Sequence, residues 1–102
     1  MPKTWTKKDK RQMERIIVKT IHYFCYGRNN AQRNSFQTKD IYRVNPEITL
    51  PPQTLGRMFL MPLVKKEVLT ATIKKRSHGG EYHRYFINFG ENELEQALKK
   101  IG

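Results

Sequence analysis

Few side chains in this 102-residue sequence have the types and spacing that catalysis or metal binding requires. The three histidines, His22, His78 and His83, fall on three different predicted elements, with no defined third and fourth ligand beside them. Cys25 is the only cysteine, which excludes an internal disulfide, and its apolar neighbours predict a buried, inert thiol. We therefore predict no catalytic residues, no metal site, no cofactor and no enzymatic activity.

Basic side chains are the more informative group. Lys and Arg number 20 against nine Asp and Glu, which gives a net charge of +11. Residues 1–89 hold 18 basic and six acidic side chains, net +12, whereas residues 90–102 carry a net charge of −1. Such an excess favours a polyanionic partner, with a merely solvated basic surface as the alternative. Nucleic acid is the expected partner.

The apolar residues are too dispersed for a membrane protein. No run approaches the roughly 18 apolar residues that a membrane span needs, and residues 1–11 lack the apolar stretch of a secretory signal. We expect one soluble, intracellular domain over residues 1–102, in the cytoplasm or nucleoid, or in the host cytoplasm if the protein is viral.

Helical spacing of apolar residues predicts two helices in the first half of the chain. After a basic arm at residues 1–6, the pair Thr6 and Asp9 has the form of a capping box that begins a helix at 7–26. Residues 35–37 are expected to be a short extended stub. Thr38 then caps a second, two-turn helix at 38–45.

A third helix is predicted at residues 51–65. Pro51 or Pro52 suits its first position, because the missing N–H is not needed there, and Pro62 is expected to kink or end it near its last turn. Gly56 lowers helix stability, and close packing on the second helix is the favoured explanation, with close approach of a DNA backbone as the alternative. The predicted buried stripe consists of Leu55, Phe59 and Leu63.

The remaining chain alternates with a period of two and predicts a β-hairpin at 68–76 and 82–89, joined by a turn at 77–80. Asn92 and Glu95 resemble another capping box, which begins a short terminal helix at 92–101. The predicted buried faces of the two strands are Leu69, Ala71 and Ile73 on the first, and Tyr85, Ile87 and Phe89 on the second.

This order of elements is similar to the winged helix-turn-helix family over about residues 7–89. The most specific portion is Thr38-Lys39-Asp40-Ile41-Tyr42, followed by Pro52-Gln53-Thr54-Leu55-Gly56-Arg57-Met58-Phe59 and ending at Val68-Leu69. The family often has Gly in the turn before the hairpin, where Lys66-Glu67 stands here. The resemblance implies an α+β fold with a three-helix core, a wing of two or three antiparallel strands and a short C-terminal helix. Similar small basic winged-helix proteins are common in archaea and their viruses and plasmids.

The resemblance also implies that the third helix enters the major groove of DNA, where Gln53, Thr54 and Arg57 meet base edges. Arg57 is suited to guanine and Gln53 to adenine, each for about 1–3 kcal/mol of discrimination. A solvated helix face is the alternative. The remaining DNA-binding candidates are Lys74, Lys75, Arg76, His78 and Arg84 on the hairpin, with Lys7, Lys8, Arg33 and Lys39 elsewhere. Trp5 is expected to be a hydrophobic lid over the first helix.

These features predict a sequence-specific, double-stranded DNA-binding protein that regulates transcription. A homodimer is expected, because one small module reads few base pairs and symmetric pairing doubles the site. Two alternatives remain open: an RNA-binding component of a ribonucleoprotein, and a protein-interaction module of a transcription or replication complex. Fold analogy alone does not choose among them.

Overall fold

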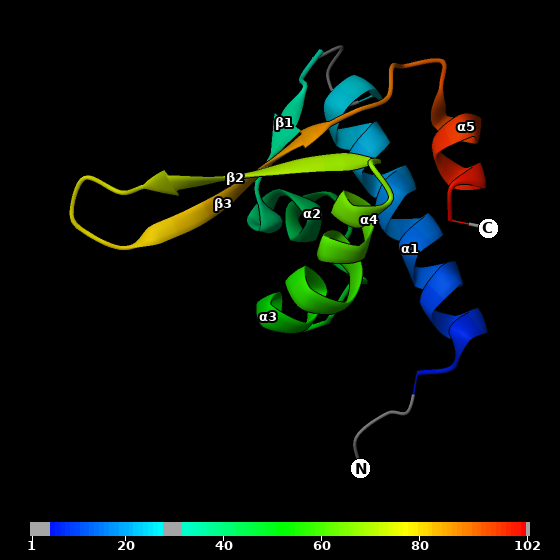
Figure 1. The fold of residues 1–102 in the computed structure, drawn as a ribbon, viewed down its shortest axis with the longest axis horizontal. Helices are drawn as coiled ribbons and strands as arrows, with labels where there is room; N and C mark the ends of the chain where they lie inside the picture. The colour runs from blue at the N-terminus through cyan, green and yellow to red at the C-terminus, as the bar shows by residue number, and fades with distance from the viewer. Residues whose placement is uncertain (1–4, 28–31, 102) are drawn as a thin grey trace.

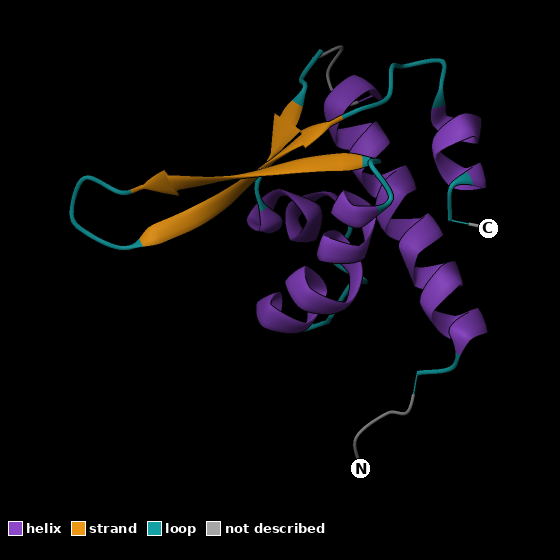
Figure 2. Cartoon of the chain, viewed as in Figure 1, coloured by secondary structure: helices purple, strands orange, loops and turns teal. Residues whose placement is uncertain are grey.

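The computed structural model describes residues 5–27 and 32–101, which form an α+β fold of four helical segments and a three-stranded antiparallel sheet (Figures 1 and 2). The helices lie below and beside the sheet, and the hairpin of β2 and β3 projects away from them. In chain order the elements are α1 (Lys7–His22), η1 (Tyr23–Gly27), β1 (Ser35–Phe36), α2 (Thr38–Val44), α3 (Pro52–Thr54), η3 (Leu55–Leu60), α4 (Met61–Lys65), β2 (Leu69–Lys75), β3 (Glu81–Ile87) and α5 (Leu94–Lys99).

The first helix begins where its capping box predicted. The Asp9 backbone N–H donates to Thr6 Oγ1 at 3.0 Å, and the Thr6 N–H donates to Asp9 Oδ2 at 3.4 Å. α1 continues directly into the π-helical turn η1, so the helical segment spans 7–27, close to the predicted 7–26. Ile17 and Ile21 from this helix are fully buried and form the base of the core.

The short stub and the second helix were both predicted, but the expected cap was wrong. Gln37, not Thr38, is the N-cap residue of α2, and its backbone N–H donates to Asp40 Oδ2 at 2.8 Å. The Asp40 carboxylate thus accepts from the N–H of the cap residue itself, and the Asp40 N–H donates to the Gln37 carbonyl at 3.0 Å instead of to a Thr38 hydroxyl. The stub is the strand β1, which pairs with β3 through Ser35 opposite Phe86 and Phe36 opposite Tyr85.

The third helix is continuous over residues 52–65, but its middle is π-helical. Pro52 occupies the first turn, as predicted, and the Met61 N–H donates to the Gly56 carbonyl, five residues back. Pro62 removes a helical N–H and crowds the preceding turn, and the wider π segment accommodates this, so the last turn continues to Lys65. The predicted stripe of Leu55, Phe59 and Leu63 is fully buried.

The turn after the third helix fixes the direction of the hairpin. The Val68 N–H donates to the Leu63 carbonyl and the Glu67 N–H to the Val64 carbonyl, both at 3.0 Å, the pattern of a Schellman motif. Glu67 has φ of 64°, the left-handed conformation that glycine adopts most easily. The sequence resemblance pointed to glycine in this turn, and the backbone at Glu67 has the conformation that glycine would suit.

Three further contacts hold this turn in place. Lys66 Nζ lies 2.8 Å from Glu14 Oε2 of α1, the one ion pair among residues 5–27 and 32–101. Asn88 Nδ2 donates to the Glu67 carbonyl at 3.1 Å, and the Asn88 N–H donates to the Val68 carbonyl at 3.0 Å. The end of the third helix is thus tied to both α1 and the chain that follows β3.

The sheet has the strand order β1-β3-β2, with the register of the hairpin running from Leu69 opposite Ile87 to Lys75 opposite Glu81. The predicted hairpin is confirmed, with strands slightly shorter than expected. Ile73 was expected to be buried and is 61% exposed. The alternation of residue types is present, but this part of the hairpin projects beyond the helices that would cover it (Figure 1).

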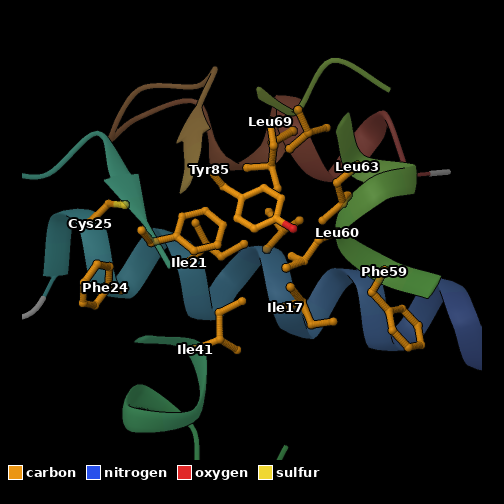
Figure 3. Close-up of a cluster of buried hydrophobic side chains, with 14 of the residues drawn as sticks. Ile17, Ile21, Phe24, Cys25, Ile41, Phe59, Leu60, Leu63, Leu69 and Tyr85 are labelled. Carbon is orange, nitrogen blue, oxygen red and sulfur yellow. The ribbon is translucent and has the colours of Figure 1, made fainter. Parts of the chain in front are cut away.

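The core lies between α1, α2, the third helix and the inner face of the sheet (Figure 3). Tyr85 on the central strand stacks on Phe36 with ring centroids 5.4 Å apart. Trp5, predicted to cover the first helix, packs edge-on against Phe59 of the third helix, with ring centroids 5.3 Å apart.

The C-terminal helix α5 packs on α1 through Ala97, Leu98 and Ile101, which are buried. It is shorter than the predicted 92–101, and the expected capping box of Asn92 and Glu95 is wrong. Glu93 occupies the N-cap position, and its carboxylate accepts a hydrogen bond from the Gly90 N–H at 3.2 Å.

The backbone at Glu67 gives a stability prediction. Glu67→Gly is expected to raise the free energy of unfolding by about 1 kcal/mol, because the left-handed conformation carries a Cβ penalty that glycine lacks. The midpoint temperature of thermal unfolding should then rise by roughly 4–8 °C. Glu67→Gln removes the charge and keeps the Cβ, so it should leave stability nearly unchanged. Equal stabilisation by both variants would show that charge, not backbone conformation, is responsible.

Candidate nucleic-acid interface

The third helix presents polar side chains on its outer face. Gln53 and Arg57 are exposed and lie one helical turn apart, whereas Thr54 is half-buried beside them. Gly56 was expected to allow close packing on the second helix, which is wrong: a Cβ built there meets no atom within 4 Å. Gly56 instead lines a hollow on the outer face, next to Gln53 and Arg57.

This hollow belongs to a cleft between the third helix, the start of α2 and the hairpin, which we call the helix–hairpin cleft. It comprises two adjoining hollows of about 300 and 320 Å³ that share Thr38, Pro52 and His83. Residues found in only one of them are Gln53, Gly56, Arg57, Met61 and Tyr85 in the first, and Gln37, Lys39, Tyr42, Arg76 and Tyr82 in the second. None of these lining residues is acidic.

The hairpin contributes basic side chains beyond the cleft. Lys74, Lys75 and Arg76 are exposed, and the Arg76 guanidinium lies 5.4 Å from the centre of the Tyr82 ring. The loop at 76–80 carries the exposed His78, and Gly79 and Gly80 supply its positive φ values of 92° and 82°. The loop therefore reverses the chain at a basic tip that stands clear of the body.

The predicted binding residues divide into three groups in space. In the first group, Gln53, Arg57, Lys39 and Arg76 line the helix–hairpin cleft, and Thr54 adjoins Gln53 on the same helix. The other members of this group, Lys74, Lys75 and His78, lie on the hairpin beyond the cleft lining. Lys7 and Lys8 begin α1, at the end of the molecule away from the hairpin tip (Figure 1).

Arg84 and Arg33 form the third group. They line a separate polar hollow of about 350 Å³, which shares no residue with the cleft. Of the predicted basic arm at residues 1–6, only Trp5 and Thr6 lie within the described residues.

The charge of this surface is not neutralised by neighbouring acids. Among residues 5–27 and 32–101 only Lys66 forms an ion pair, with Glu14, and this pair lies at the end of the third helix, away from the cleft lining. Glu81 stands opposite Lys75 in the hairpin without pairing with it. The exposed cations on the cleft side are thus available to a polyanion.

Sequence reasoning missed several residues of the cleft. His83, considered only as a weak metal ligand, lies on both hollows, and Met61 and Tyr82 add apolar surface. No local pattern identifies them, because their place in the cleft depends on how far the hairpin leans over the third helix.

The side chains that first suggested chemistry have other surroundings. His22 Nε2 lies 2.7 Å from the Glu91 carbonyl, and the ring stacks near Phe89. In the part of the chain that the structure describes, no three His, Cys, Asp or Glu side chains are grouped closely enough to hold a metal ion. Cys25 is buried, as predicted, and burial raises the pKa of its thiol from 9.0 to about 11, against a smaller lowering by Arg33.

Comparisons of this chain with protein-family models, with curated proteins and with solved structures gave no match. Within the described residues, no helix has both the length and the apolar character needed to cross a membrane.

The environment of Cys25 predicts a slow thiol. With a pKa of about 11, roughly one thiol in a thousand is ionised at pH 8, so a disulfide reagent should label the folded protein only as fast as it unfolds. The unfolded chain loses the thiol proton near pH 9, before the folded chain does. This group's contribution to stability is therefore complete below about pH 9 and is lost between pH 9 and about 11. Rapid labelling of the native protein at pH 8 would contradict the burial.

Proposed function

We propose that this protein is a winged helix-turn-helix protein that binds double-stranded DNA and reads its sequence through the third helix. The order of elements and the strand order β1-β3-β2 support this arrangement, with the β2–β3 hairpin as the wing. The short β1 adds a third strand to that sheet.

The observation that carries the proposal is the exposure of Gln53 and Arg57, one turn apart at the start of a helix beside an uncompensated basic hairpin. A helix that enters the major groove contacts base edges with its first turns. Arg donates two hydrogen bonds to guanine O6 and N7, and Gln pairs in the same two-pronged manner with adenine. The half-buried Thr54 would contact a phosphate or a thymine methyl group.

The hairpin cations have a different role in this proposal. Lys74, Lys75 and Arg76 lie on a projecting hairpin whose loop has two glycines and therefore little bulk. Side chains of this kind neutralise phosphates, which sets affinity and position on the duplex without reading sequence. Lys39, on the far side of the cleft, extends the same contact to the start of α2.

Two variants separate base reading from phosphate binding. Arg57→Ala should reduce the preference for the best duplex over a scrambled duplex by about 1–3 kcal/mol, because it removes a contact to a base edge. Lys74→Ala with Lys75→Ala should weaken all duplexes alike and lower the log–log salt slope by about 2. Fluorescence anisotropy across a salt series measures both quantities.

The matched control is Lys99→Ala with Lys100→Ala, which removes the same charge from exposed positions at the end of α5. It should leave sequence preference unchanged and alter affinity less than the hairpin pair does. Phosphate contacts are strong at about 50 mM salt, so the absence of binding to any duplex there would contradict the proposal. Tighter binding to an RNA stem than to DNA would indicate that RNA is the ligand.

The proposal includes a homodimer, since one module of this size reads few base pairs. Selection from random duplexes is expected to enrich a palindrome whose half-sites lie about 10 base pairs apart or a multiple of that. Sedimentation of the complex should show two chains per duplex. Enrichment of a single asymmetric half-site, with one chain bound, would exclude the dimer and leave the DNA-binding proposal standing.

A further inference from the structure

A second basic site lies outside the helix–hairpin cleft, in a hollow of about 350 Å³ beside β1, which we call the Arg33–Arg84 pocket. Its lining is almost wholly polar and comprises Gln32, Arg33, Asn34, Ser35, Asp40 and Arg84, with Phe24 at its base. The start of β1, the central strand β3 and helix α2 all contribute to it. Residues distant in the sequence thus converge on one small volume.

Both arginines are held in position. The Arg33 backbone N–H donates to the Cys25 carbonyl at 2.8 Å, and the Arg33 guanidinium lies 5.0 Å from the centre of the Phe24 ring. Arg84 Nε donates to Ser35 Oγ across the pair of strands at 3.1 Å. The ring contact restricts the Arg33 side chain, and the hydrogen bond to Ser35 restricts the Arg84 side chain. This restriction lowers the entropy cost of binding a ligand.

The charges around the pocket favour an anion. Asp40 is its one acidic lining residue, and its Oδ2 already accepts the Gln37 N–H at 2.8 Å. Neither Arg33 nor Arg84 lies within 4.0 Å of a carboxylate among the described residues. The lining thus includes two arginines and one engaged carboxylate, so the pocket keeps a net positive charge and most of its N–H donors.

We propose that the Arg33–Arg84 pocket binds a phosphate group, at a site separate from the DNA-reading cleft. A phosphate offers several acceptor oxygens, which suit the forked donors of two arginines together with the hydroxyl of Ser35 and the amides of Gln32 and Asn34. A free phosphate ester or a phosphodiester of a bound nucleic acid supplies the same chemistry. With a free phosphate ester the site is independent of DNA binding, whereas with a phosphodiester it rests on the proposed function, and the probes below separate the two cases.

The test follows the Nε–H signals of the arginines by NMR during titration of the full chain. The probes are inorganic phosphate, a nucleoside monophosphate and a DNA duplex, each against chloride at equal ionic strength. Saturable shifts of the Arg33 and Arg84 signals are expected with at least one probe. Arg33→Gln should weaken binding of that probe roughly tenfold or more, since it removes a charge-assisted donor pair and keeps the Arg84–Ser35 bond.

The matched control is Arg43→Gln, which removes an exposed arginine of α2 outside the pocket and should leave binding unchanged. Shifts with the monophosphate but not with the duplex would identify a free ligand, and shifts with the duplex that Arg33→Gln abolishes would identify the nucleic-acid backbone. Chemical-shift changes that grow linearly with the concentration of every probe would overturn the proposed phosphate site. So would changes of equal size in the Nε–H signal of Arg43. If the duplex binds but neither the duplex nor the two phosphate probes shift the Arg33 and Arg84 signals, the phosphate-site inference is wrong and the DNA-binding proposal stands.

Discussion

The turn at Lys66, Glu67 and Val68 is the constraint on which the rest of the structure depends. It ends the third helix and begins β2 with no intervening loop, so it fixes the angle between the helix and the hairpin. A left-handed residue, a half-buried ion pair to α1 and two hydrogen bonds from Asn88 all meet there. Without this turn the helix–hairpin cleft would have no defined shape.

The angle between the third helix and the hairpin determines which part of the hairpin is buried. Its inner half is covered by the helices and carries the buried Leu69 and Tyr85, whereas its outer half extends into solvent and leaves Ile73 exposed. A strand that only stabilised the fold would end where the core ends. The extra length adds little burial, and it carries the basic tip away from the body.

The arrangement of charge follows from the same geometry. Ion pairing is confined, among the described residues, to Glu14 and Lys66 at the base of the third helix, where it fixes the fold. The cations that line hollows fall into two separate groups, one at the helix–hairpin cleft and one in the Arg33–Arg84 pocket. Arg84 shows why sequence position alone misleads: on the opposite face of β3 from Tyr85, it turns towards β1 instead of the hairpin tip.

The sequence by itself determined the elements and the sign of the charge, because both depend on local information. Apolar spacing placed the stripe of Leu55, Phe59 and Leu63, and alternation placed the hairpin. Only the tertiary structure decided which side chains share a site. The exposure of Ile73 depends on where the helices stop covering the hairpin, and the meeting of Arg33 and Arg84 in one pocket depends on segments distant in the sequence. Periodicity carries no information about where one element ends against another.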